Sequence, residues 1–158
     1  MTNDISQKTK ILSATKLFAD LSLPALQLLG NSFKELEFAA GQTIFREDEP
    51  GNSMMVVMEG ELRVSFLAGR DEETLIVLRS GDFFGEMALL EDQPRTASVV
   101  AVTDVRLLEI ERDSFYSFLS QDCASGVIIL LKLCRALSSR LRETDQRVRT
   151  FVHLAQWL

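Results

Sequence analysis

Histidine and cysteine are scarce in this chain, whose 158 residues include one histidine, His153, and two cysteines, Cys123 and Cys134. One histidine is too few for the usual metal-ligand sets, and neither cysteine has a histidine neighbour, so we expect no metal site. The chain also has no Ser/His/Asp order and no nucleoside-triphosphate loop, so we expect that it is not an enzyme. We predict that both cysteines are buried free thiols.

Long apolar runs and positive charge are missing as well. No apolar run approaches the ~18 residues that cross a bilayer, and the N-terminal MTNDISQKTK lacks the hydrophobic centre of a secretory signal. The net charge of −6 argues against broad binding to nucleic acid or to anionic membranes. We therefore expect a cytoplasmic protein that does not itself bind DNA or membranes.

The chain changes its hydrophobic period twice. Apolar residues between 5 and 33 recur at helical spacing, and Leu23-Pro24 interrupts them, which predicts two short helices with a cap at Ser22 or Leu23. From 35 to 111, short apolar runs alternate with glycine turns, such as Gly51 and Gly60, for which we expect positive φ. This pattern is typical of an antiparallel sandwich or barrel, in which 97–102 and 105–110 would pair across the turn at 103–104.

The last thirty residues predict one long helix, because neither glycine nor proline occurs between 127 and 158. A domain of this size cannot bury a helix of nearly fifty ångströms at ~1.5 Å per residue, so part of it needs a partner. We predict a homodimer in which two such helices pair in parallel. The predicted dimer seam alternates spacings of three and four and consists of Val127, Leu130, Cys134, Leu137, Leu141, Thr144, Val148, Phe151, Ala155 and Leu158.

The most informative stretch is residues 80–100, SGDFFGEMALLEDQPRTASVV. Gly85 allows close backbone approach and begins a helical turn whose free N–H groups can hold an anion. The side chain of Arg95 ends in a planar, permanently charged guanidinium, which suits binding to a phosphate. Glu86 is an acceptor-only carboxylate, placed to accept from a ribose hydroxyl. These residues describe a site for a ribose cyclic phosphate; the alternative is a surface hairpin with an ordinary Glu–Arg pair.

This stretch resembles the phosphate-binding cassette of cyclic-nucleotide-binding domains, which occur in bacterial catabolite-activator-type regulators, cyclic-nucleotide-dependent kinases and gated ion channels. The matching residues are Phe84-Gly85-Glu86, Ala88-Leu89-Leu90 and Pro94-Arg95-Thr96-Ala97. The resemblance implies that Glu86 binds the ribose 2′-hydroxyl and Arg95 the cyclic phosphate. It also implies a phosphate cradle completed by Gly85, Met87, Ala88, Thr96 and Ala97.

The resemblance further implies a fold that is mainly β with flanking helices. We expect N-terminal helices over 1–34, an antiparallel jelly roll of about eight strands over 35–112, and a short helix with a long dimerisation helix over 113–158. These parts would form one structural domain. The apolar wall of the nucleotide pocket would include Val64, Leu75 and Leu78, which can equally be ordinary barrel core.

The segment 140–148 is similar to the dimer helix of the catabolite activator proteins. There a threonine at the place of Thr144 contacts the adenine amino group, and the next residue, from the partner subunit, does so too. That next residue is serine in those proteins and Asp145 here, which leaves the partner contact open although Asp can accept from an amino group. Two roles are possible for Thr144 itself: a contact to the base, or an ordinary position of the dimer seam.

These expectations define a dimeric sensor whose regulatory ligand is a cyclic nucleotide. Thr144 favours cAMP, and Thr96 leaves cGMP as the alternative. Occupancy would shift the long helix and so signal to an unidentified downstream protein partner. Two alternatives remain: the sensor half of a bacterial catabolite-activator-type transcription regulator, and an interaction dimer that has lost ligand binding.

Overall fold

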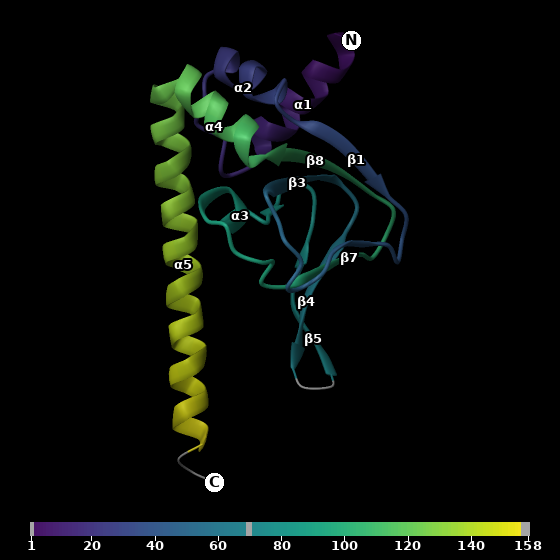
Figure 1. Cartoon of the computed structure of the whole chain (residues 1–158), viewed down its shortest axis with the longest axis vertical. Helices are drawn as coiled ribbons and strands as arrows, with labels where there is room; N and C mark the ends of the chain where they lie inside the picture. Colours follow the sequence, from purple (N-terminus) through teal and green to yellow (C-terminus); the bar gives the residue numbers. More distant parts are fainter. Residues whose placement is uncertain (1, 69–70, 156–158) are drawn as a thin grey trace.

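The structure, a computed structural model, describes residues 2–68 and 71–155. Two helices precede a β-barrel and two follow it, with one short helix between the strands (Figure 1). The helices are α1 (Thr2–Ala14), α2 (Leu23–Gly30), α3 (Met87–Leu90), α4 (Arg112–Gln121) and α5 (Cys123–Ala155). The strands are β1 (Lys34–Phe38), β2 (Thr43–Phe45), β3 (Ser53–Glu59), β4 (Leu62–Ala68), β5 (Asp71–Leu78), β6 (Phe83–Phe84), β7 (Ser98–Ala101) and β8 (Val105–Glu111).

The strands form two antiparallel four-stranded sheets, ordered β1-β8-β3-β6 and β2-β7-β4-β5. This arrangement confirms the predicted jelly roll with flanking helices and a long C-terminal helix. The two-residue strand β6 was not predicted, because two residues are too few for a hydrophobic alternation to show. It pairs with β3 directly before α3 and so ties the predicted cassette to the barrel.

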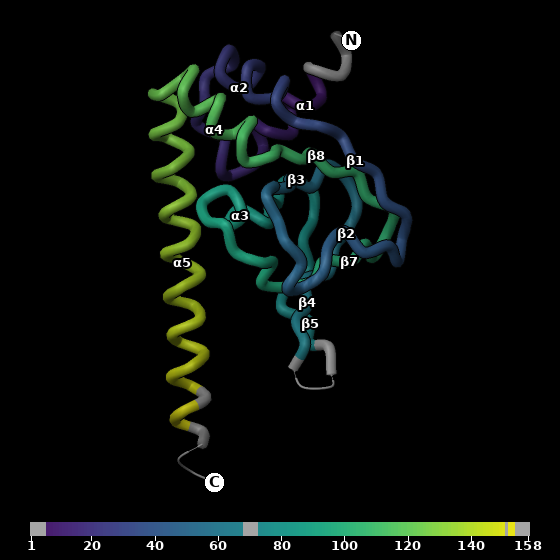
Figure 2. Tube along the Cα trace, viewed as in Figure 1, coloured from purple at the N-terminus to yellow at the C-terminus, as the bar shows by residue number. Residues whose placement is uncertain are grey.

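The predicted pairing of 97–102 with 105–110 is wrong. β7 lies between β2 and β4 (Figure 2), whereas β8 lies between β1 and β3 in the other sheet. Val99 and Ala101 of β7 and Val105 and Leu107 of β8 are all buried in the same interior cluster. Since the two sheets face each other across this core, the turn at 103–104 has to cross from one sheet to the other.

The helices α1, α2 and α4 lie together at one end of the barrel (Figure 1), and a second apolar cluster joins them to it. It contains side chains from α1, α2, α4, α5, β3 and β8, with Phe18 and Phe33 edge to face at 6.0 Å between ring centroids. Ser22 caps α2 as predicted, because its Oγ accepts from Ala25 N at 3.4 Å. α4 begins at Arg112, one residue before the predicted boundary at 113, and the backbone N–H of Arg112 donates to Asn52 O at 2.7 Å.

The long helix α5 has 33 residues and runs from the helical end past the side of the barrel (Figure 1). Hydrogen bonds from the side chain and backbone of Ser125 lower the pKa of Asp122, which precedes the first turn. Ile129 and Leu133 are buried and hold the first half of α5 in the helical cluster. No helix within the described ranges is long and apolar enough to cross a membrane.

The predicted seam of α5 divides between two faces of the helix. Leu130 and Leu137 pack against the helical cluster of the same chain. Val127, Cys134, Leu141 and Val148 are exposed and form a stripe that Leu131 and Val152 extend. The side chain of Phe151, and Leu158, lie outside the described residues.

Compared with the predicted seam, every second position of the exposed stripe lies one residue further along the chain. The exposed stripe follows positions 127, 131, 134, 138, 141, 145, 148 and 152, which keeps the alternation of four and three. Leu130 and Leu137 are partly buried against the helical cluster of their own domain, so the exposed stripe does not include them. The cysteine prediction is corrected as well: Cys123 and Cys134 are free thiols, as expected, but both are exposed.

Candidate functional site

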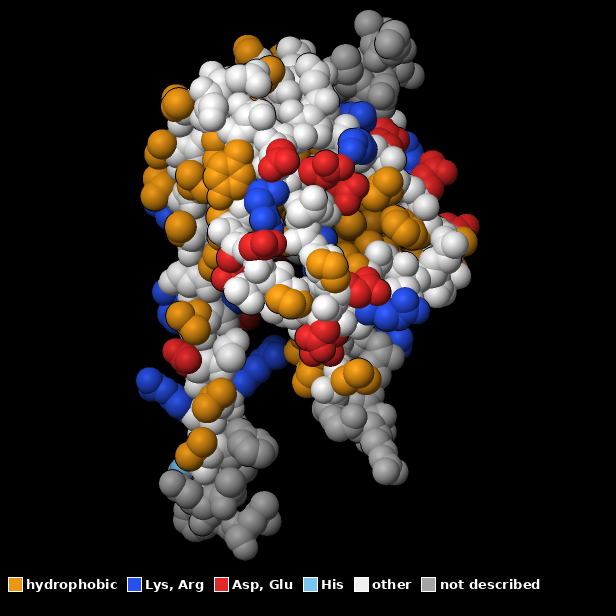
Figure 3. Space-filling model, in the orientation of Figure 1, with side chains coloured by type: hydrophobic (Ala, Val, Ile, Leu, Met, Phe, Trp, Pro, Cys, Tyr) orange, Lys and Arg blue, Asp and Glu red, His pale blue; other side chains and the backbone are white. Residues whose placement is uncertain are grey.

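A pocket of about 330 Å³ lies between the barrel and α5, next to α3 (Figure 3). All the predicted ligand residues except Asp145 line it: Val64, Leu75, Leu78, Gly85, Glu86, Met87, Ala88, Arg95, Thr96, Ala97 and Thr144. Sequence reasoning missed further lining residues, among them Phe45, Ile76, Phe84, Arg140, Glu143 and Arg147. The pocket therefore combines an apolar wall from β4 and β5 with charged groups from 85–95 and from α5.

Arg95 is a nearly buried cation, with 8 % of its surface exposed. Its Nη1 donates to Ser53 O at 2.8 Å and its Nη2 to Ser53 Oγ at 3.1 Å. The guanidinium lies over the Phe45 ring at 4.1 Å from the centroid. Burial lowers the pKa of Arg95, but a guanidinium stays protonated in proteins. Its Nε is buried and has no hydrogen-bond partner among the described residues, so this cation keeps a donor for an anion.

Two glycines make room for this guanidinium. Gly85 has φ +74°, and a Cβ on it would lie 2.7 Å from Arg95 Nη1. A Cβ on Gly51 would lie 2.2 Å from Arg95 Nε. Gly51 does not have the positive φ predicted for it, although Gly60 does, at +90°. Gly51 is therefore required by the close approach of Arg95 rather than by its backbone conformation.

Glu86 is the most deeply buried acidic side chain of the pocket, with 2 % of its surface exposed. Its Oε1 forms an ion pair with Arg140 Nη1, which reaches it from α5. The Arg140 guanidinium lies 5.8 Å from the centroid of the Phe83 ring. Arg140 was missed in the sequence, although it stands four residues before Thr144 and so on the same helix face.

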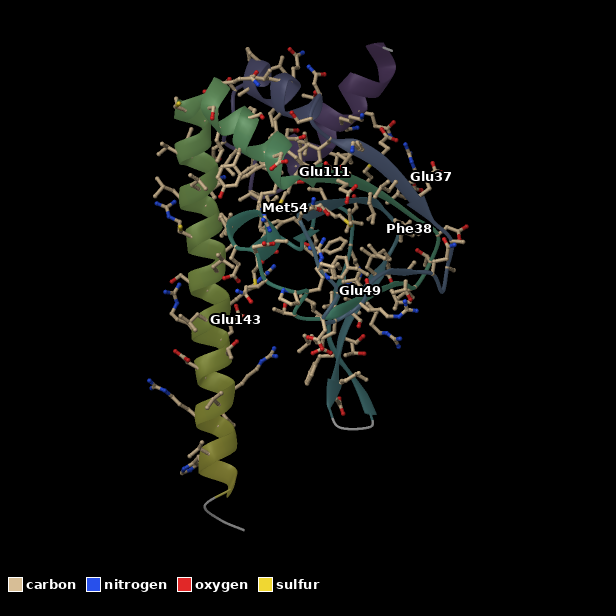
Figure 4. All side chains as sticks on the ribbon, viewed as in Figure 1. Glu37, Phe38, Glu49, Met54, Glu111 and Glu143 are labelled. Atoms are coloured by element: carbon tan, nitrogen blue, oxygen red, sulfur yellow. The ribbon has the colours of Figure 1, made fainter. Side chains whose placement is uncertain are left out.

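The far end of the pocket is formed by α5 and the apolar residues of β4 and β5. Thr144 Oγ1 donates to Arg140 O at 2.9 Å, so its hydroxyl faces a ligand only as an acceptor. Glu143, labelled on α5 in Figure 4, and Arg147 add a carboxylate and a cation to the same lining. Asp145 is exposed, does not line the pocket and occupies a position of the exposed stripe.

Comparison with known proteins decides the family. A family model described as cyclic nucleotide-binding domain matches residues 35–122, more than half of the chain. The chain belongs to the cyclic-nucleotide-binding domain family. The match includes the barrel, the 80–100 stretch and α4. The chain thus contains a cyclic-nucleotide-binding regulatory domain, in agreement with the resemblance of its cassette.

Three relatives of this domain illustrate the likeness. The CRP-like cAMP-activated global transcriptional regulator of Mycobacterium tuberculosis is 29 % identical over 140 residues, which are 88 % of this chain and 61 % of the regulator. A cGMP-dependent protein kinase of Caenorhabditis briggsae is 45 % identical over 87 residues, 55 % of this chain and 11 % of the kinase. The solved Thermus thermophilus catabolite activator protein superposes with a TM-score of 0.80 at 30 % identity, covering 87 % of this chain and 63 % of that one. The chain spans about three-fifths of the two regulators.

Proposed function

We propose that this cyclic-nucleotide-binding domain is a sensor for cAMP, with cGMP as the alternative ligand. The observation that carries the proposal is Arg95, a desolvated cation whose Nε has no partner among the described residues and which lies beside Glu86 in one pocket. Burying this charge is costly, and a phosphate would add an anionic partner together with hydrogen bonds.

The proposed pose uses three parts of the pocket. The cyclic phosphate accepts from Arg95 and lies against Gly85 and its neighbours. The ribose 2′-hydroxyl donates to Glu86, whose Oε1 is paired with Arg140. The base fills the apolar wall and reaches Thr144 on α5. Each part receives a group that matches it in charge or polarity.

The preference for cAMP is supported by Thr144. Because its hydroxyl already donates to Arg140 O, its oxygen can accept from the exocyclic amino group of adenine. The name of the Mycobacterium relative, a cAMP-activated regulator, points the same way. Two observations keep cGMP as the alternative: the likeness to a cGMP-dependent kinase, and the additional charges of Glu143 and Arg147, which could bond to guanine.

The output of the proposed sensor is the long helix. The exposed stripe on α5 is regularly spaced and apolar at six of its eight positions, with Ser138 and Asp145 as the polar ones, which supports a parallel homodimer through this face. Ligand contacts to Glu86 act on α5 through Arg140, so occupancy can bias the position of this helix for a downstream protein partner. Because the two regulators are longer, the sensor half of a transcription regulator stays the second candidate.

Titration calorimetry with cAMP and then cGMP tests the ligand. We expect one site per chain, tighter for cAMP, and a loss of more than ~1.5 kcal/mol in binding free energy in Arg95→Met and in Glu86→Gln. Arg79→Met is the control, because Arg79 is an exposed arginine that pairs with Glu61 away from the pocket. If neither nucleotide binds, the sensor proposal fails and the interaction dimer without ligand takes its place.

A further inference from the structure

The side chain of Arg112, at the start of α4, joins three segments that are distant in sequence. Its Nε donates to Ala88 O at 2.7 Å, and its Nη2 donates to Glu91 O at 2.8 Å. Nη2 also reaches Gly51 O at 3.4 Å, and Nη1 lies 3.5 Å from Asp92 Oδ1. The backbone N–H of the same residue donates to Asn52 O at 2.7 Å.

The first of these segments is the end of α3. Ala88 O and Glu91 O are carbonyls of its last turn and of the residue after it, where a cation is favourable. α3 carries Met87 and Ala88 of the pocket lining, and its orientation sets where this part of the lining lies. Arg112 therefore holds the C-terminal end of α3, whereas the predicted phosphate cradle begins at its N-terminal end.

The second segment is 51–53, which positions Arg95. Ser53 accepts two hydrogen bonds from the Arg95 guanidinium, and Gly51 lies against its Nε. Arg112 bonds to Gly51 O and Asn52 O, so it also holds this segment. One residue thus contacts the supports of both halves of the anion site, the α3 side and the Arg95 side.

The third segment is α4 itself. α4 packs against α3, β8 and α5, and Phe115 and Phe118 fix it in the helical cluster. Because Arg112 is the first residue of α4, a shift of α4 displaces the guanidinium and a shift of α3 pulls on it. A planar guanidinium is needed to link α4 to α3 in this way, because its Nε and Nη2 donate to two different carbonyls. A lysine ammonium on its flexible side chain cannot reproduce that geometry.

We propose that Arg112 is a positioning residue that fixes both halves of the anion site relative to α4 and so couples nucleotide occupancy to α4 and α5. This inference rests on the proposed function for its ligand. The positioning role of Arg112 does not rest on it, because the bonds of Arg112 to 51–52 and to 88–91 are made entirely between groups of this chain.

The test compares Arg112→Met and Arg112→Lys with Arg106→Met, in the full chain. Arg106 is the matched control: it is a partly buried arginine on β8 that pairs with Glu35, Glu37 and Glu59 at the other end of that strand. Amide hydrogen exchange is measured for peptides covering 51–53, 87–91 and α5, without ligand and with saturating cAMP. Affinity for cAMP is measured by calorimetry in parallel.

In Arg112→Met we expect faster exchange in 51–53 and 87–91 without ligand and cAMP affinity about tenfold weaker. At saturating cAMP, the ligand-induced change in α5 exchange should be lost although the site is full. Arg112→Lys should keep the fold and restore only part of the affinity, and it replaces Arg112→Met if that variant does not fold. Arg106→Met should lower stability and leave the exchange of both segments and the affinity unchanged.

Two results overturn the inference. Wild-type exchange in both segments together with wild-type affinity in the Arg112 variants would remove the positioning role. A wild-type response of α5 in a saturated Arg112 variant would remove the coupling. If the wild-type protein binds no cyclic nucleotide, the proposed function fails instead, and the exchange of 51–53 and 87–91 without ligand still decides the positioning role.

Discussion

The carboxylate of Glu86, buried beside α3, is paired with the guanidinium of Arg140 on α5. This ion pair joins the predicted ribose acceptor to the long helix across 54 residues of sequence. Glu86 is almost fully buried, whereas about half of the Arg140 side chain is exposed. The pair is therefore asymmetric: losing Arg140 leaves a buried charge without compensation, and losing Glu86 leaves a cation that water can reach.

Arg140→Met should destabilise the protein by about 2 kcal/mol, less than the ~3–5 kcal/mol of a fully buried pair because Arg140 is half exposed. Glu86→Gln alone should cost less, since it removes the buried charge itself. In the double variant the cost of Arg140→Met should largely disappear, and denaturant unfolding of all four proteins measures this coupling. Additive free-energy changes would mean that the pair contributes nothing to folding.

Gly51→Ala should weaken nucleotide binding by about tenfold or more without unfolding the protein. The added Cβ would lie 2.2 Å from Arg95 Nε, so the guanidinium has to move away from Ser53 and from the anion that it is proposed to hold. Gly30→Ala is the control, because a Cβ there meets its nearest neighbours at an ordinary 3.8 Å. Calorimetry that finds equal affinity in both variants would contradict the assignment of Arg95 as the anion ligand.

The cassette was predictable because its chemistry is local. Gly85, Glu86 and Arg95 lie within eleven residues, and the role of each can be predicted from its charge or its backbone freedom alone. Arg140 and Arg112 were not predictable in the same way. The partner of Arg140 is 54 residues away and those of Arg112 are 20 to 61 residues away, and nothing in the local pattern of a helix indicates which carboxylate or carbonyl its arginines will contact.

The fold shows the same difference between local and distant information. Alternation of apolar residues predicted most strands, yet it placed β7 and β8 in one hairpin, because the period does not say which sheet a strand joins. The spacing of apolar residues in α5 likewise predicted a seam. The predicted seam and the exposed stripe share positions 127, 134, 141 and 148, however, and differ by one residue at the positions between them. Only the packing of Leu130 and Leu137 on their own domain separates the covered face from the exposed one.

Leu141→Asp should convert the protein to monomers in light scattering, because it places a charge in the middle of the proposed interface. Leu141 is 63 % exposed in the single chain, so the substitution should leave the fold of that chain unchanged. Leu67→Asp is the matched control, since Leu67 is 66 % exposed on β4 and away from the stripe. A Leu141→Asp protein that stays dimeric would place the interface elsewhere.

Cys134 offers a test of how two copies of α5 are oriented. In a parallel pair, equal positions of the stripe face each other, so the two exposed Cys134 thiols would come within reach of a disulfide. Mild oxidation with a copper catalyst, in which oxygen takes up the two thiol electrons, should then give a covalent dimer on a non-reducing gel. Cys123→Ser should retain this dimer and Cys134→Ser should lose it.

In an antiparallel pair residue 134 would face its own copy only if it stood at the centre of the overlap. A dimer in solution that forms no Cys134 cross-link would therefore contradict the parallel arrangement, and with it the idea that both nucleotide sites act on one shared helix pair.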